Sequence, residues 1–248
     1  RERVLGDRAA IALPEFFGKT FQHQRDSTNF TKACQYEEYF PPRDLWTEVH
    51  ICPSRLGLIC CVRDITTRKR TERILTGQKR VLELVTTGAK LGVILDAITA
   101  MVEDQSARDL CTILLLSDDG RRLHLGSGGS VDPAYNAAIE GLEIGPAVGS
   151  CGTAAFTRRR VIASDIATDA KWAPYKEIAL GHGLAACWSQ PILSRDGQRV
   201  LGTIANYSRT PAEPTRQSLM LLATAAHLAQ IAIEAEEAAR ERRLPARE

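Results

Sequence analysis

The sequence predicts an α+β protein in which two modules are joined by a helix. Short segments that alternate apolar and polar residues, separated by turn residues, occupy 35–65 and 109–207. Apolar residues at helical spacing occupy 66–104 and 214–243 instead. With 248 residues the chain is long enough for two ordinary domains, and its 44% hydrophobic and 25% charged residues are typical of globular proteins.

Three antiparallel strands are expected in the first module. The segments QYEEYF, LWTEVHI and LICCVRDIT are separated by the turns PPRD and CPSRLG. In the middle segment Thr47, Val49 and Ile51 share one face, as the period of two in a strand requires. The polar stretch that precedes them, 18–33, is compatible with a helix.

A charged helix without proline follows from Thr66. Leu75, Leu82 and Ala89 recur at intervals of seven, which suits a short parallel coiled coil between two copies. A solvated connecting helix explains the same pattern, and the sequence does not choose between them. Gly88 ends this helix, and a second helix follows with one apolar stripe. The stripe consists of Leu91, Ile94, Leu95, Ile98, Met101 and Val102.

The second module alternates hairpins and short helices. DDG joins the strands LCTILLLS and RRLHLGS, and RDGQ joins AACWSQPILS and RVLGTIANYS. Between these hairpins, GSCGTAA opens a short helix, RRRVIASDI forms a strand, and WAPYKEIALGHG forms a helix that ends on glycine. A long helix from Pro214 to about Arg243 closes the chain. Its end, EAEEAARERR, has no hydrophobic face and is either surface or the start of a coil that leads to a further domain.

Charge and cysteine usage narrow the classes of partner. Lysine plus arginine number 32 against 30 acidic residues, so no basic excess indicates a nucleic-acid surface. No apolar run approaches the ~18 residues of a membrane span, and RERVLGDRAA lacks a signal-peptide pattern. Seven cysteines without CxxC pairs or zinc-type spacing indicate reduced thiols and a cytoplasmic protein. Solvated surface explains the charge clusters 68–73 and 158–160, with anionic lipid or nucleic acid as a minor alternative.

Segment 36–69 resembles the C-terminal strands of a PAS domain. The sharpest part is the closing strand with Val62-Arg63-Asp64-Ile65-Thr66, followed by a basic helix start. About 65 residues precede the helix, so the first PAS hairpin is shortened or absent. We therefore expect a partial PAS domain over 1–66 and a connecting helix over 67–88.

Residues from about 78 to 236 resemble a bacterial subgroup of GAF domains. Four ordered blocks carry the resemblance: Gly149–Ala155, Asp165–Asp169, His182–Ile192 and Val200–Thr203. The resemblance implies a GAF domain over 89–236, with a six-stranded antiparallel sheet, helices on its back and a ligand pocket on its front. It also implies that 237–248 begin a helical linker to a missing output domain, which is a histidine kinase or a cyclic-di-GMP enzyme. No GGDEF, EAL or kinase ATP-site motif occurs in the chain.

The resemblance places seven residues around the ligand pocket. They are Cys151, Asp165, Trp172, Tyr175, His182, Trp188 and Ser189. Aromatic side chains with a few polar groups suit a small-molecule cavity. A packed lid is the alternative, in which Trp172 anchors its segment to the sheet and Asp165 caps a turn.

Cys151 raises the question of catalysis, because a helix N-terminus stabilises a thiolate. Free methionine-R-sulfoxide reductases are GAF-fold enzymes with a similar C-G-T-A-A run and further cysteines near the pocket. Here the nearest second cysteine is Cys187, whose surroundings differ from the reductase pattern, so we expect it in the wrong place for that chemistry. Bilin attachment is disfavoured because Gly152, not histidine, follows Cys151. Haem would need His182 or His124 as its axial ligand.

Together these patterns predict a sensory module that is not itself an enzyme. A small ligand in the GAF pocket would shift the packing of the helices 66–104 and 214–243 in a homodimer, and the output domain would respond. No cofactor is required. The alternatives are a thiol enzyme that uses Cys151, a haem-based sensor, and a dimerisation scaffold with an empty pocket.

Overall fold

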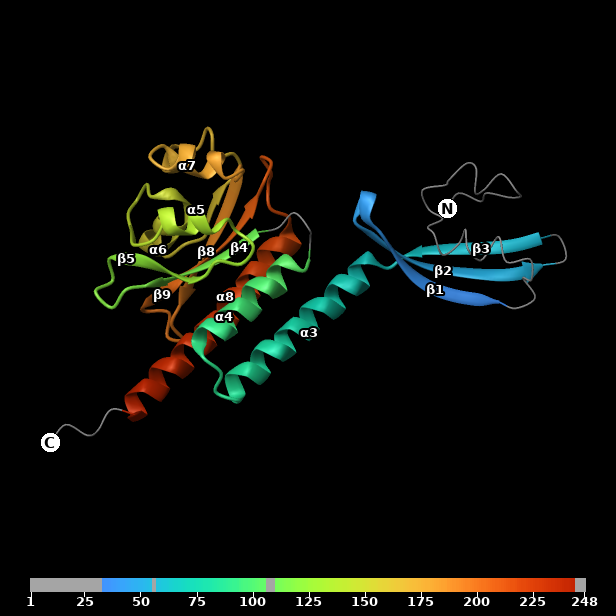
Figure 1. The fold of residues 1–248 in the computed structure, drawn as a ribbon, viewed down its shortest axis with the longest axis horizontal. Coiled ribbons are helices and arrows are strands. Elements are labelled where there is room, and N and C mark those ends of the chain that lie inside the picture. Colours follow the sequence, from blue (N-terminus) through green and yellow to red (C-terminus); the bar gives the residue numbers. More distant parts are fainter. Residues whose placement is uncertain (1–32, 55–56, 106–109, 244–248) are drawn as a thin grey trace. The chain divides into compact units, whose positions relative to one another are not determined.

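A computed structural model of the chain describes residues 33–54, 57–105 and 110–243 (Figure 1). Nearly all of the helix-compatible stretch 18–33 lies outside the described residues, as does about half of the predicted partial PAS region. The chain divides into two compact units, Arg1–Glu72 and Arg73–Glu248. The connecting helix α3 (Thr66–Thr86) contributes residues to both units, so each unit is described by itself.

The first unit contains a three-stranded antiparallel sheet, as predicted. Its strands β1 (Cys34–Phe40), β2 (Leu45–Ser54) and β3 (Gly57–Asp64) lie in the order β1-β2-β3. Thr47, Val49 and Ile51 are all buried, which confirms the alternation read from β2. The predicted PPRD turn is a short 3-10 helix, η2 (Pro41–Arg43), which ends at Asp44 in the left-handed conformation with φ 49°.

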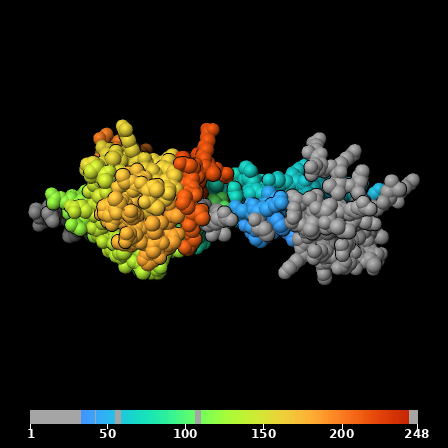
Figure 2. All heavy atoms as spheres, turned by 90° about the horizontal axis from the view of Figure 1, so that it is seen from above, coloured from blue at the N-terminus to red at the C-terminus, as the bar shows by residue number. Residues whose placement is uncertain are grey.

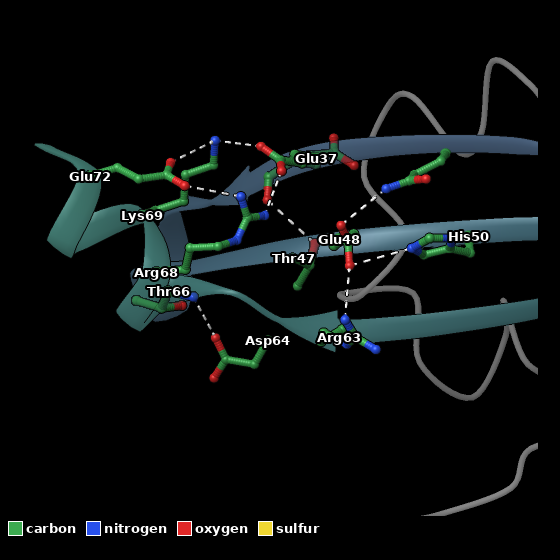
Figure 3. Close-up of polar contacts among 12 residues, drawn as sticks. Glu37, Thr47, Glu48, His50, Arg63, Asp64, Thr66, Arg68, Lys69 and Glu72 are labelled. Atoms are coloured by element: carbon green, nitrogen blue, oxygen red, sulfur yellow. Dashed lines mark hydrogen bonds and ion pairs between the residues drawn. The ribbon is translucent and has the colours of Figure 1, made fainter.

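Polar contacts fix the first turn of α3 to this sheet (Figure 3). The Asp64 carboxylate accepts a hydrogen bond from the backbone N–H of Thr66 at 2.8 Å. It thereby satisfies one of the N–H groups that a helix start leaves without partners. The Thr66 hydroxyl accepts the N–H of Trp46 at 2.9 Å. Glu37 on β1 pairs with Arg68 at 2.6 Å and with Lys69. The beginning of the helix is therefore held by side chains from β1 and β3 and by a backbone N–H of β2.

Glycine ends α3 where the sequence predicts it. Gly88 has φ +69°, a conformation that side chains with a Cβ rarely adopt. The N–H of Ala89 bonds to the carbonyl of Leu84 at 3.0 Å, and the N–H of Gly88 to that of Val85 at 3.1 Å. These two bonds form a Schellman motif, which satisfies the last carbonyls of the helix. The next helix, α4 (Leu91–Glu103), can therefore start immediately.

A six-stranded antiparallel sheet forms the centre of the second unit and confirms the predicted sheet. Its strand order is β6-β5-β4-β9-β8-β7. The strands are β4 (Leu110–Leu116), β5 (Arg122–Ser127), β6 (Leu142–Glu143), β7 (Val161–Ala163), β8 (Ala186–Leu193) and β9 (Val200–Ser208). The two-residue β6 and the one-and-a-half-turn helix α5 (Pro133–Ala138) were not predicted, because elements so short show no measurable periodicity.

Helices cover the back of the sheet. In Figure 1, α4 and α8 (Arg216–Arg243) lie side by side across it. The predicted stripe of α4 packs there with the apolar side of α8, and Val81 from α3 is fully buried in the same core. By length and composition α8 resembles a membrane span, but half of its most apolar window is buried inside the domain. Packing in the core of this unit therefore explains about half of the apolar character of α8.

The front of the sheet carries a second core. It is covered by α5, α6 (Gly149–Thr157), a short 3-10 helix η3 (Ala170–Trp172) and α7 (Lys176–Gly181). Figure 2 looks onto this side, where the yellow and orange atoms of the segment around α7 form the surface. Because side chains alternate along a strand, Cys187 faces this front core and Trp188 faces the helices at the back.

Two residues of the β8–β9 hairpin explain parts of the sequence motifs. A Cβ on Gly202 would lie 2.2 Å from the carbonyl oxygen of Leu114, so only glycine lets β9 approach β4 this closely. Pro191 lies in β8 beyond the three residues that pair with β7. The missing N–H of proline therefore costs no ladder hydrogen bond on that side.

Candidate functional site

Cys151 lies in the first turn of α6 and is buried between this helix and the front face of the sheet. Its Sγ is 4.0 Å from the hydroxyl oxygen of Tyr207. Small residues surround it because space is short: a Cβ on Gly152 would meet the Val148 side chain at 2.7 Å, and Gly149 has φ +52°. The run GSCGTAA thus forms a tight helix start pressed against the sheet, as predicted.

Cys187 lies beside Cys151, which corrects our expectation for this residue. It sits on β8 directly opposite Tyr207 on β9, the residue whose hydroxyl is next to the Sγ of Cys151. The hydroxyl of Ser150 donates to the Cys187 carbonyl at 3.3 Å, which fixes α6 against β8. The sequence comparison with the reductase pattern failed because it followed spacing along the chain, whereas helix packing brings the two thiols together.

The two thiols have opposite pKa shifts. Hydrogen bonds from Cys187 first, and then from Ser189, Thr203 and Tyr207, lower the pKa of Cys151 to about 7 against the opposing effect of burial. Burial and the neighbouring Cys151 raise the pKa of Cys187 well above its ordinary value. Burial, followed by the charge of Cys151, likewise raises the pKa of Tyr207. Cys151 is therefore the first group of this cluster to ionise, and its neighbours keep their protons and donate to it.

An aromatic and polar chain connects the thiols to the surface. The rings of Tyr207 and Tyr135 meet edge to face with centroids 5.8 Å apart, and Tyr135 meets the His182 ring at 5.9 Å. The Nδ1 of His182 is 2.9 Å from a carboxylate oxygen of Asp132. Asp132 also accepts the N–H of Ala134 and thereby caps α5. The structure thus adds three residues to the site: Asp132, Tyr135 and Tyr207.

Sequence signals for these additional residues exist but are faint. Asp132 followed by Pro133 is a helix-start pattern, since aspartate suits the cap and proline the first turn. Tyr207 is four residues from Thr203 on a strand, so the two share a face. Neither pattern indicates that these residues belong to the site around Cys151.

Four other predicted site residues also come to the front face. Trp172 is buried and donates its indole Nε1–H to Ser150 Oγ at 3.0 Å. Tyr175 packs against the same core, half-buried, just before α7. Ser189 is fully buried and donates its hydroxyl to the carbonyl of Ile204 at 3.4 Å, while His182 stands at the rim.

The remaining predicted residues lie elsewhere. Trp188 belongs to the core at the back of the sheet, among the helices. Asp165 accepts the N–H of Ala167 at 3.0 Å and shapes the turn after β7, the capping role considered for it. His124, the other candidate haem ligand, is half exposed and pairs with Glu140 at 2.7 Å. Among the described residues no group of three or more His, Cys, Asp or Glu is arranged to hold a metal ion.

The β8–β9 hairpin connects the front of the unit to α8. Arg158, at the end of α6, donates to the carbonyl of Gly197 at the hairpin turn. From the same hairpin the backbone N–H of Arg195 donates to Glu234 at 2.8 Å, and Arg199 pairs with Glu237 at 2.9 Å. A movement of α6 can therefore reach α8 through three polar contacts.

Comparison with known families decides the class of the second unit. A family model described as a GAF domain matches residues 90–234. The chain belongs to the GAF domain family. The matched residues include the whole front core, with Cys151 and Cys187, and all of the back core except what α3 and Ala89 contribute. A "Methyl sulfide methyltransferase-associated sensor" of Methanosarcina acetivorans is 39% identical over 187 residues, which are 74% of this chain. The chain spans only 19% of the length of that relative.

Solved structures agree with the GAF fold. The GAF domain of an Acinetobacter phosphoenolpyruvate-protein phosphotransferase matches with a TM-score of 0.53 and 16% identity, over 68% of this chain and 97% of that one. A free methionine-R-sulfoxide reductase of Neisseria meningitidis, in complex with its substrate, matches with a TM-score of 0.52 and 17% identity, over 68% and 91%. At these identities the two matches establish the fold alone.

Proposed function

We propose that this chain is the input portion of a signal-transduction protein, in which a small ligand acts at the front face of the GAF domain. The observation that carries the proposal is the buried cluster of Cys151, Tyr207 and Tyr135, which His182 connects to the surface. Ionisable groups with perturbed pKa values cluster at functional sites. Membership of the GAF family and the similarity to a protein named as a sensor support the same class.

The ligand would contact residues from the segments that cover the front face. We assign this role to Cys151, Trp172, Tyr175, His182 and Ser189, because they share one core or its rim. Such a mixture of aromatic and polar groups suits a small organic ligand. Asp165 would shape the neighbouring turn, and Trp188 would act only from the far side of the sheet.

The ligand state would reach α8 through the β8–β9 hairpin. Arg158 connects α6 to the hairpin turn, and Arg195 and Arg199 connect the hairpin to Glu234 and Glu237. A ligand can prefer one of two positions of α6. If each position of α6 goes with one position of α8, that difference in binding free energy also shifts the equilibrium between the two positions of α8.

A homodimer would carry the signal onward to an output domain, a histidine kinase or a cyclic-di-GMP enzyme. Leu75 and Leu82 are 58% and 44% exposed on α3, seven residues apart, which favours a partner helix from a second copy. The first unit would be the remainder of a PAS domain, and the protein would be cytoplasmic. Leu75→Glu with Leu82→Glu is expected to give monomers in analytical ultracentrifugation. Leu125→Glu, an equally exposed change on β5, is the control.

Native mass spectrometry of the purified chain tests the ligand. A small molecule that leaves on denaturation, and whose occupancy falls in His182→Ala, is the expected result. Glu140→Ala, at another surface histidine pair, should retain it. An absorbance spectrum taken on the same sample would reveal haem. If the chain shows no ligand at any stage, and metabolite pools leave its thermal stability unchanged, the ligand-sensing proposal is wrong.

One observation favours a second function. The contact between Cys151 and Cys187 supplies a nucleophile and a resolving thiol, which sulfoxide reduction requires. Reduction of free methionine sulfoxide by the chain with dithiothreitol, abolished in Cys151→Ala, would support a thiol enzyme. Absence of turnover under those conditions would leave the sensory function.

A further inference from the structure

We propose that Cys151 and Cys187 are a modification site, at which a hydroperoxide converts the two thiols into a disulfide between α6 and β8. The inference goes beyond the sensory function and stands without it, because it concerns only the two thiols and an oxidant. It also requires no sulfoxide substrate.

Three contacts bring the two cysteines together. Both side chains are buried in the front core. Tyr207 is the cross-strand partner of Cys187 and at the same time touches the Sγ of Cys151. Ser150, the residue before Cys151, bonds to the carbonyl of Cys187. Side-chain rotation can therefore bring the sulfurs to the ~2.05 Å of a disulfide while the backbone contact between α6 and β8 is retained.

The surroundings give the two thiols different chemical roles. The hydroxyl of Tyr207 lies 4.0 Å from the Sγ of Cys151, and the polar groups around Cys151 lower its pKa, so its thiolate is the better stabilised of the two. A thiolate is the form that attacks peroxide, so Cys151 reacts first. Cys187 keeps its proton longer and is the resolving thiol.

The reaction balances in two steps. The Cys151 thiolate attacks one oxygen of hydrogen peroxide, which forms a sulfenic acid and releases hydroxide. The sulfur of Cys187 then attacks the Cys151 sulfur, the S–O bond breaks, and the proton of Cys187 leaves with the hydroxyl group as water. Overall two thiols lose two electrons and two protons, and one peroxide becomes two waters.

Burial restricts the oxidant to small molecules. Cys151 is 5% exposed and Cys187 is fully buried, so hydrogen peroxide can reach them only as water does, whereas a bulky disulfide such as oxidised glutathione cannot. The product joins the helix start of GSCGTAA covalently to β8. The disulfide would hold α6 in one position on the sheet. The contacts of Arg158 with the hairpin and of Arg199 with α8 would then be fixed as well.

Peptide mapping of the intact chain tests the proposal directly. After trypsin, Cys151 lies in the peptide 123–158, Cys187 in 177–195 and Cys111 in 109–121. We expect a small excess of hydrogen peroxide to crosslink 123–158 to 177–195 under non-reducing conditions. Dithiothreitol should separate the two peptides again. The wild-type chain suffices for this result, so a variant that fails to fold does not weaken it.

A matched variant adds specificity. Cys111→Ser removes another fully buried thiol, on the opposite face of the sheet, and should leave the crosslink unchanged. Cys187→Ser should abolish it and let Cys151 proceed to sulfinic acid. The proposal is overturned if the wild-type chain accumulates sulfinic acid at Cys151 with 177–195 still reduced. It is equally overturned if the crosslink instead joins 109–121, or if peroxide leaves both thiols unmodified.

Discussion

The indole Nε1–H of Trp172 donates a hydrogen bond to Ser150 Oγ at 3.0 Å, within the buried front core. The Nε1 of Trp188, buried on the opposite face, has no hydrogen-bond partner among the described residues. Both tryptophans are almost fully buried, so replacement by phenylalanine removes similar volume from each core. Only Trp172→Phe also removes a hydrogen bond, which contributes about 1 kcal/mol.

We therefore expect Trp172→Phe to lower the free energy of unfolding by about 1 kcal/mol more than Trp188→Phe. Urea denaturation of the two variants, followed by circular dichroism, measures the difference. Equal losses would show that the bond to Ser150 contributes nothing to stability.

Tyr207→Phe is expected to raise the pKa of Cys151 from about 7 toward the ordinary thiol value. Phenylalanine keeps the ring beside Tyr135 and removes only the hydroxyl that donates to the thiolate. The other donors, Cys187, Ser189 and Thr203, remain. Thiolate absorbance in the ultraviolet, titrated in the wild type and in Cys151→Ala, isolates the Cys151 signal.

Tyr175→Phe serves as the control for that titration, because Tyr175 packs on the same core and is not among the groups bonded to Cys151.

Since the folded pKa of Cys151 is lowered, its ionisation stabilises the fold as pH rises from 7 toward 9. Cys187 acts in the opposite direction. Because its pKa is raised in the folded protein, it lowers the stability of the fold once the pH exceeds the ordinary pKa of a thiol. An unchanged Cys151 titration in Tyr207→Phe would contradict the assigned role.

Gly202→Ala should destabilise the second unit strongly. The new Cβ would be 2.2 Å from the Leu114 carbonyl oxygen and 3.1 Å from the Leu115 Cα, and both are backbone atoms that cannot rotate away. A loss of about 2–3 kcal/mol is expected from this overpacking. Gly181→Ala meets nothing within 4 Å and should be neutral or stabilising by up to about 1 kcal/mol. Thermal unfolding that ranks the two variants the other way would refute the close approach of β4 and β9.

Glu37 provides a pH-dependent test of the contacts at the start of α3. Hydrogen bonds from Lys69 first, and then from Arg68, lower its pKa below the ordinary value (Figure 3). A lowered carboxyl pKa means that the ion pair stabilises the first unit at neutral pH and that this contribution is lost as pH falls through the folded pKa. In a carboxyl NMR titration, Lys69→Gln should raise the Glu37 pKa more than Arg68→Gln. Lys79→Gln, whose pair is Glu83, should not move it.

Strand alternation and turn residues were enough to predict most of the architecture. The three strands of the first unit, the two hairpins of the second, α4 and the break at Gly88 all follow from local patterns. The prediction failed for β6 and α5, whose few residues are held by packing rather than by their own periodicity.

The candidate site was less accessible to sequence reasoning. Five of its seven predicted residues lie on the front face or at its rim, whereas Asp165 shapes a turn and alternation along β8 sends Trp188 to the opposite face from Cys187 and Ser189. The proximity of Cys151 and Cys187 was also missed, since it depends on how α6 docks on the sheet. Distances between a helix and a strand that are 30 or so residues apart are set by tertiary packing, which spacing does not encode.

Because consecutive residues of β8 serve different cores, the strand tolerates no change in length. Inserting or deleting a single residue before Cys187 would reverse the faces of the strand. The Cys187 thiol would then point to the back core and the Trp188 indole to the front core, so both cores would receive the wrong side chain. A change in length fits better at the RDGQ turn, where Gly197 has open space around it, than within β8. Grafting a new front face onto the scaffold thus requires keeping the parity of β8, even if every residue on that face is replaced.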